Sequence, residues 1–275
     1  MRLVAGAAIA LALTSLAAAQ QPRPPAPRPT PAPRTPSKVP ALPQSPRREI
    51  AVPFKVGETL TYDVSWSQFL TAGTATVRVV EKKPSNGSTA YSIVADGRPV
   101  PLVARFYPVY YKMDSLLDSF TGLSQWTSTY SEESGRKRQS FTRFDRAARR
   151  AFYEDPAEPS LKQDFPVPVN VQDGLATLYA IRGRAFKARE RFTIPVADDG
   201  SLYNVEFEVS GPERVSVPFG DFNAWNVRIT ILDAQGQSVA SNTVAWISTD
   251  GRRLPVKLQS DLSLGSFVLA LRDAR

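Results

Sequence analysis

The 275-residue sequence contains neither cysteine nor histidine. Without cysteine, the folded chain must hold together without disulfides. Without histidine, it lacks the commonest general base and metal ligand in proteins. Catalysis by Ser-His-Asp or Cys-His groups is therefore excluded, as are zinc sites of the usual ligand sets. An enzyme built on this chain would have to use carboxylates, Lys, Ser or Tyr, and we expect no cofactor and no metal.

The net positive charge is small outside the N-terminal tail, because basic and acidic residues nearly balance there. The formal net charge of the chain is +8, but residues 21–49 alone carry six basic residues against Glu49, and Arg2 precedes them. These residues account for all but two of the net positive charges. Since nucleic-acid binding needs a basic face on the fold itself, we predict that nucleic acid is not a partner.

The N-terminus has the layout of a secretory signal. Arg2 precedes an apolar run from Leu3 to Leu16, and the small residues Ala17 to Ala19 follow. We predict a signal peptide over residues 1–19, a disordered Pro/Arg-rich linker over residues 20–49, and an antiparallel β domain over residues 50–275. The apolar run is shorter than the roughly 20 residues that span a bilayer, so no transmembrane span should remain after signal removal. The predicted location is periplasmic or secreted.

Strict alternation of apolar and polar residues recurs from residue 59 onward. The segments "TLTYDVSW", "LYNVEFEV" and "AWNVRITI" alternate over their whole length, which is typical of antiparallel strands with one buried face. Asn86-Gly87, Asp199-Gly200 and Asp250-Gly251 supply the positive φ angles of tight hairpin turns. The pattern predicts an all-β fold, β-rich with one short helix. About a dozen strands should form a long antiparallel meander curled into an open or half barrel.

One segment, "NVQDGLATLYAIRG" (170–183), has the pattern of a helix. We expect Asn170 as its N-cap, Asp173 as a capping-box acid three residues later, and Gly183 as its end. Its apolar face should include Leu175, Leu178 and Tyr179, with Arg182 burying only its stem. A helix this short persists mainly by packing, so it should lie in or over the concave face of the sheet.

Several segments resemble, in order, a family of exported bacterial proteins, the domain of unknown function 3108. The matching segments are "FKVGETLTYDVSW", "TAGTATVRV", "RFYPVYYKMDSLLD", "NVQDGLATLYAIRG", "SLYNVEFEVSGPERVSVPFGDFNAWNVRI" and "WISTDGRRLPVKLQSDLSLGSFVLAL". The resemblance implies an all-β exported protein and supplies no catalytic residues. A curved antiparallel sheet with a helix in its concavity is also similar to the lipoprotein carriers LolA and LolB, at the level of the fold alone.

The candidate binding residues are aromatic and apolar side chains of the expected concavity, together with two arginines beside a turn. Arginine suits carboxylate and phosphate groups, and apolar walls with a few polar contacts suit a small ligand. The predicted ligand-binding residues are Trp66, Tyr111, Trp126, Leu178, Tyr179, Trp225, Arg252 and Arg253. Candidate partners are a lipid or lipoprotein, or an anionic envelope polymer.

The carboxylates offer the alternative reading. Asp63 and Asp114 lie on the expected wet faces of strands and Asp173 at a helix cap, surroundings that favour the ionised form. We therefore predict an exported, envelope-associated binding or structural module without catalytic residues, whose ligand is partly apolar. The alternative is a carboxylate-based hydrolase acting on cell-wall glycan, which would need two acids facing each other in one groove. A third possibility is a scaffold whose concavity is filled by its own side chains.

Overall fold

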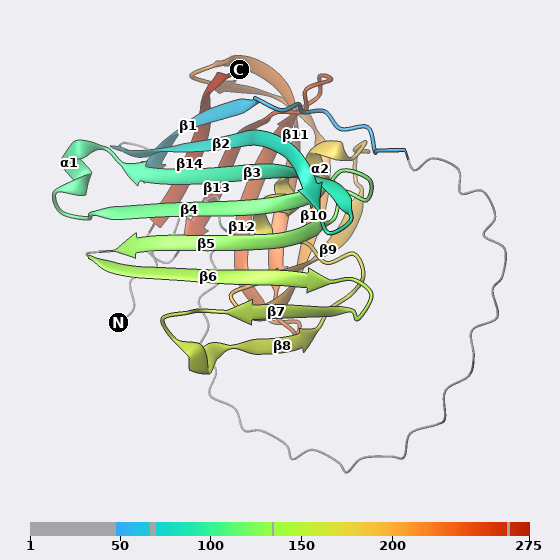
Figure 1. Ribbon diagram of the computed structural model, residues 1–275. Helices are drawn as coiled ribbons and strands as arrows, with labels where there is room; N and C mark the ends of the chain where they lie inside the picture. Colours follow the sequence, from blue (N-terminus) through green and yellow to red (C-terminus); the bar gives the residue numbers. More distant parts are fainter. Residues whose placement is uncertain (1–47, 67–69, 134, 263–264) are drawn as a thin grey trace, which may run out of the picture.

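The structure is a computed structural model that describes residues 48–66, 70–133, 135–262 and 265–275. Its dominant feature is one curved, antiparallel sheet of 14 strands (Figure 1). The predicted all-β class is therefore confirmed. The predicted signal peptide, and all of the predicted linker except Arg48 and Glu49, lie outside the described residues. No helix within the described ranges is long and apolar enough to cross a membrane.

The strands divide into two consecutive groups. The first comprises β1 (Thr59–Trp66), β2 (Leu70–Ser85), β3 (Ser88–Pro99), β4 (Val109–Asp118), β5 (Ser124–Glu133), β6 (Arg136–Asp145), β7 (Arg150–Glu154) and β8 (Gln163–Pro166). The second comprises β9 (Arg191–Asp198), β10 (Ser201–Val217), β11 (Gly220–Leu232), β12 (Ser238–Ser248), β13 (Pro255–Leu262) and β14 (Gly265–Ala274). The helices are α1 (Pro101–Ala104), the 3-10 turn η2 (Pro159–Leu161) and α2 (Gly174–Gly183).

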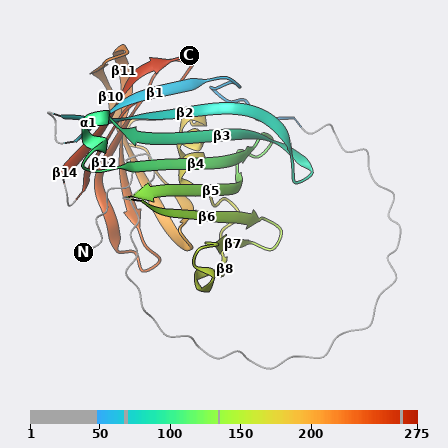
Figure 2. The same cartoon turned by 60° about the vertical axis from the view of Figure 1, so that its left-hand side comes forward.

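The order of strands places both edges of the sheet in the middle of the chain. Neighbours in sequence pair throughout each group, and β1 pairs with β14, which joins the two groups. The edges are β8 and β9, the two strands that flank the segment carrying α2. The strands of the second group run steeply behind those of the first, so the sheet curls on itself without closing into a barrel (Figures 1 and 2).

Two of the three predicted tight turns have the predicted backbone. Asn86 and Gly87 have φ of 48° and 70°, and Asp199 and Gly200 have φ of 45° and 76°, as two-residue hairpins with the right-handed strand twist require. The prediction for Asp250-Gly251 is wrong, because the positive φ falls on Arg253, at 45°. Asp250 instead accepts hydrogen bonds from the backbone of Arg252 and Arg253, at 3.0 and 3.1 Å, and this makes a longer loop.

The helix begins later than its sequence pattern predicts. Asp173, and not Asn170, is the N-cap, and its carboxylate accepts a hydrogen bond from Ala176 N at 2.7 Å. The residues before Asp173 cannot be helical, because Gln172 pairs with edge strand β9. The backbone N–H of Gln172 donates to Pro195 O at 2.9 Å, and the carbonyl of Gln172 accepts from Ala197 N at 2.9 Å. The sheet edge therefore takes the backbone groups that a longer helix would have used.

Helix α2 packs inside the curve of the sheet, as predicted. Leu175 and Tyr179 belong to a cluster with strands β1 to β4, β13 and β14 and with one residue each of β10 and β11, whereas Ile181 belongs to a second cluster with β9 to β12. The helix therefore joins the cores of both strand groups. The prediction that Arg182 buries only its stem is wrong. The whole residue is 0% exposed, since a partner for its charge is buried with it.

The β9–β10 hairpin brings the two sheet edges close together. Gly200 lies so near β7 and β8 that a Cβ on it would stand 3.1 Å from the side chains of Tyr153 and Gln163. Tyr153 donates a hydrogen bond to Asp199 at 2.7 Å, and Arg138 pairs with Asp155 and Asp199 at 2.8 and 3.1 Å. These side-chain contacts connect the two edges of the curved sheet, although β8 and β9 are not paired with each other by backbone hydrogen bonds.

Candidate functional site

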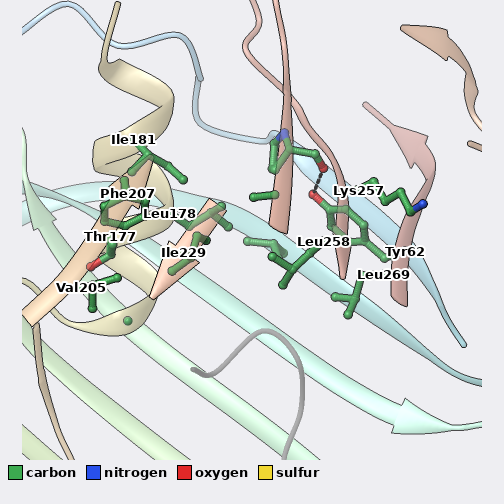
Figure 3. Close-up of a pocket in the computed structure, with 14 residues that line it drawn as sticks. Tyr62, Thr177, Leu178, Ile181, Val205, Phe207, Ile229, Lys257, Leu258 and Leu269 are labelled. Atoms are coloured by element: carbon green, nitrogen blue, oxygen red, sulfur yellow. Dashed lines mark hydrogen bonds between the residues drawn. The ribbon is translucent and has the colours of Figure 1, made fainter. Parts of the chain in front are cut away.

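A cavity of about 80 Å³ lies between α2 and the concave face of the sheet (Figure 3). Helix α2 contributes one wall, and strands β1, β2 and β10 to β14 contribute the others. The residues that line the cavity are Tyr62, Val77, Gly174, Thr177, Leu178, Ile181, Val205, Phe207, Ile229, Ala245, Pro255, Lys257, Leu258 and Leu269. The cavity therefore lies where the sequence predicts a binding site, in the concavity under the helix.

The polar groups of the cavity wall are already bonded within the protein. The hydroxyl of Tyr62 donates to Pro255 O at 2.9 Å, and that of Thr177 donates to Asp173 O at 2.7 Å. The ammonium of Lys257 points away from the other lining side chains and lies 4.8 Å from the centre of the Trp246 ring (Figure 3). None of the lining residues, all drawn from the described part of the chain, is Asp or Glu. The walls therefore offer apolar contact and no acid.

Buried polar bonds fix the N-terminal end of α2 to the first strand group. Ser115 on β4 donates to Asp173 Oδ2 at 2.7 Å, and Ser124 on β5 donates to the same oxygen. Oδ1 accepts from Ala176 N. Burial raises the pKa of the Asp173 carboxyl above its usual value, despite these donors. The expectation that its surroundings favour the ionised form is therefore wrong, because the residue is only 1% exposed.

A buried ion pair fixes the C-terminal end of α2. Arg182 donates to both oxygens of Glu58, at 2.6 and 2.9 Å, just before β1. It also donates to the carbonyls of Arg253 and Arg252, at 3.1 and 3.2 Å, in the loop between β12 and β13. Because both ends of the helix are held, α2 is a fixed cover over the cavity.

Asp198, at the end of β9, is an acid with a strongly raised pKa that does not line the cavity. Burial, together with the nearby charges of Asp199 and Asp173, raises its pKa to about 7. A carboxyl with this pKa is what a general acid needs. Its neighbour Asp173, however, is enclosed and has both oxygens bonded to protein donors. Nowhere in the described residues does a group of three or more Asp or Glu gather in a way that could hold a metal ion.

The raised pKa of Asp198 predicts a stability that falls as pH rises. Between its unfolded value of about 4 and its folded value of about 7, the folded state keeps a proton that the unfolded state has lost. The free energy of unfolding should therefore decrease across that window and level off above it. In Asp198→Asn this part of the decrease should disappear, so the variant should gain stability relative to the natural chain at about pH 8 and not at about pH 4. Urea unfolding at both pH values measures this, and parallel pH profiles would contradict it.

Of the predicted ligand-binding residues, Leu178 lines the cavity. Tyr179 lies on the same helix but points into the core, where its ring meets that of Phe54 edge-on, with centroids 4.8 Å apart. Trp66, at the end of β1, is 37% exposed and stacks on Phe267, with ring centroids 5.9 Å apart. Of Leu178, Tyr179 and Trp66, the cavity is therefore lined by Leu178 and not by the two aromatic side chains.

The other five predicted residues lie elsewhere. Trp126 packs on Phe141 and Trp225 on Phe186, while Tyr111 donates a hydrogen bond to Glu133. Arg253 donates to the carbonyls of Arg182 and Arg184, and Arg252 to that of Ala274 at 3.3 Å. Both arginines bond to backbone carbonyls here and do not line the cavity.

Most of the cavity wall was not singled out from the sequence. Val205, Phe207 and Ile229 were placed on inward faces by their alternation, but that pattern does not tell a side chain beside a void from one in close contact. Ala245 and Lys257 lie in the segments "NTVAWIS" and "LPVKLQS", whose alternation is weaker and predicts a strand but no site. The ion pair of Glu58 and Arg182 was missed as well, because the two residues are 124 positions apart in sequence.

The fold and the cavity define a class of protein: an open, barrel-like antiparallel sheet wrapped around a covering helix. The sequence matches the family described as "Protein of unknown function (DUF3108)" over residues 61–272. The chain belongs to this family, as its sequence pattern predicted. No curated protein matches the sequence.

Solved structures with a similar fold include a β-barrel-like protein of Brucella abortus, described as a domain of unknown function, DUF1849. It is 11% identical, with a TM-score of 0.51 over 80% of this chain and 97% of its own. A Bacteroides fragilis protein described as exported, with a YmcC-like fold, is 10% identical with a TM-score of 0.32. A Parabacteroides distasonis protein described as a lipoprotein is 9% identical with a TM-score of 0.36. Each of these two matches covers 83% of this chain and all of the other.

Proposed function

We propose that this protein is a non-catalytic binding module of the cell envelope, periplasmic or secreted, that holds an alkyl group of its ligand beneath α2. The observation that carries the proposal is the chemistry of the cavity wall. Its hydroxyls are bonded to backbone carbonyls, its one ammonium points away, and the remaining walls are apolar. Such a site can exclude water and gain free energy from apolar burial, but it presents no group to react.

The size of the cavity limits what it holds with α2 in place. An engineered apolar cavity of about 150 Å³ holds one benzene molecule, and the cavity here is about 80 Å³. It has room for the end of an alkyl chain and not for a whole lipid. Binding of a longer chain therefore requires α2 to shift, which the bonds at both of its ends oppose.

The acid pair formed by Asp173 and Asp198 does not suit the glycan-hydrolase alternative. Asp173 and Asp198 are close enough for the charge of one to raise the pKa of the other. Asp173 is nevertheless enclosed, and it has both oxygens occupied by Ser115, Ser124 and Ala176. A paired-carboxylate mechanism needs both acids at the sugar, on either side of the bond that breaks. The favoured reading is therefore the binding module.

Filling the cavity tests the proposal. Ala245 is 2% exposed and lines the cavity, so Ala245→Leu should place its added carbons in the void. We expect the variant to be as stable as the natural chain or more stable, by up to about 2 kcal/mol, as for other cavity-filling changes. It should bind a fluorescent fatty acid, cis-parinaric acid, at least about tenfold more weakly. Thermal unfolding and a fluorescence titration measure the two effects.

Ala224→Leu is the matched control. Ala224 is 0% exposed and belongs to the core, but it does not line the cavity. The same added volume there should overpack the core and cost about 1 to 3 kcal/mol. Below its unfolding transition, the control should bind the fatty acid as the natural chain does. Equal fatty-acid binding by the natural chain and Ala245→Leu would overturn the proposed site, and no binding by either would favour a scaffold filled by its own side chains.

A further inference from the structure

The loop that carries α1, between β3 and β4, exposes apolar side chains to an unusual degree. Phe106, Leu102 and Tyr107 are 74%, 63% and 55% exposed, and they are the three most exposed large apolar residues that the structure describes. All three lie within six consecutive positions. Single exposed apolar residues are ordinary on protein surfaces, but a contiguous group marks an interaction site.

The backbone of this loop is ordered by its own hydrogen bonds. Val100 N donates to Ala72 O at 2.9 Å, which ties the loop to β2, and Phe106 N and Tyr107 N donate to Val103 O at 3.0 and 2.8 Å. Helix α1 stands beyond the ends of β2, β3 and β4 (Figure 1). The apolar side chains are therefore presented at one end of the molecule by a defined turn.

The charge of the surrounding segment has one sign. Residues 97–113 contain Arg98, Arg105 and Lys112 and no acidic residue, although Lys112 pairs with Asp114 at 2.9 Å and leaves the two arginines as the charges of the loop itself. Arg105 is exposed and forms no ion pair with a residue that the structure describes. Arg98 lies 3.8 Å from Asp96 and keeps 66% of its side chain exposed. Aromatic side chains next to two exposed arginines, one of them without an ion pair to a described residue, match the interface of a bilayer with anionic head groups.

We propose that the α1 loop docks the protein on the surface of a membrane containing anionic phospholipid, with Leu102 and Phe106 inserted among the acyl chains and Arg98 and Arg105 on the head groups. This docking does not depend on whether the cavity holds a ligand. An apolar protein partner would also use Leu102 and Phe106, but it would not require a lipid surface of negative charge.

A dye at position 102 tests insertion directly. The chain has no cysteine, so Leu102→Cys gives a single attachment point for an environment-sensitive fluorophore. Val239→Cys, on β12, is the control, because Val239 is also exposed, at 45%. On vesicles of phosphatidylcholine mixed with phosphatidylglycerol, the dye at 102 should shift to the blue and the dye at 239 should not. Equal responses at the two positions would overturn the proposal.

Vesicle co-sedimentation of the full chain tests how much the apolar and basic side chains of the α1 loop contribute to membrane binding. Phe106→Ser should weaken binding by about tenfold, and Arg105→Gln by about fivefold, as expected for one inserted ring and one surface arginine. Val239→Ser should bind as the natural chain does. The basic segment over residues 21–49 can also attract anionic vesicles. The Phe106→Ser comparison is therefore made in high salt as well, where the attraction of that segment is screened and apolar insertion persists.

The outcomes separate the possible sources of binding. A loss in Phe106→Ser that persists in high salt, with binding to mixed vesicles stronger than to pure phosphatidylcholine, supports docking by the loop. Unchanged sedimentation of Phe106→Ser, or no sedimentation of any form with mixed vesicles, contradicts it. The second result would leave a protein partner as the occupant of the loop.

Discussion

Replacing Arg182 with methionine is expected to lower the free energy of unfolding by about 3 to 5 kcal/mol, the usual cost of breaking a buried ion pair from one side. The guanidinium is 0% exposed, and Glu58 is 4% exposed. In Arg182→Met, the Glu58 carboxylate would stay in the core without its cation. The carbonyls of Arg252 and Arg253 would also lose their donor. Urea unfolding of the variant and the natural chain measures the difference.

A double variant separates the lost pair from lost packing. In Arg182→Met with Glu58→Leu, no charge is left unpaired, and well-packed apolar replacements of a buried pair are often neutral. The double variant should therefore recover most of the stability that Arg182→Met loses. Arg191→Met, at the exposed pair with Glu208, should cost less than about 1 kcal/mol. A loss of similar size in Arg182→Met and Arg191→Met would mean that the buried pair does not fix α2.

Leu175→Ala should destabilise the protein by about 2 to 5 kcal/mol, as large-to-small changes in a packed core do. Leu175 is 0% exposed and belongs to the cluster in which α2 packs on strands β1 to β4, β13 and β14. Leu178→Ala should cost less, because Leu178 is only partly buried and borders the cavity, so it has fewer contacts to lose. Thermal and urea unfolding of both variants measure how much stability each one loses. If both changes cost less than about 0.5 kcal/mol, α2 would lie on the surface and the covering role would be wrong.

The strands were predictable because their signal is local. In "LYNVEFEV" every second residue is apolar, and Tyr203, Val205, Phe207 and Val209 are all buried in β10. Turn chemistry at Asn86-Gly87 and Asp199-Gly200 fixed the ends of two hairpins for the same reason. The existence and the concave placement of the helix also followed from its composition and length.

Features set by contacts between distant residues were not predictable. The start of α2 depends on the pairing of Gln172 with β9, a strand that begins about 20 residues later along the chain. The burial of Arg182 depends on Glu58, and the position of the sheet edges depends on the pairing of β1 with β14. The cavity depends on where side chains from seven strands and one helix fail to fill space, and no single segment carries that information.

Native mass spectrometry of the protein purified from its own envelope tests the binding account most directly. The account predicts that the natural chain carries an additional mass in the range of a lipid or fatty acid, which dissociates on activation. Ala245→Leu, prepared in the same way, should be largely free of that mass although it folds. The account would be contradicted if the added mass were equally abundant on both proteins, or if the natural chain carried none.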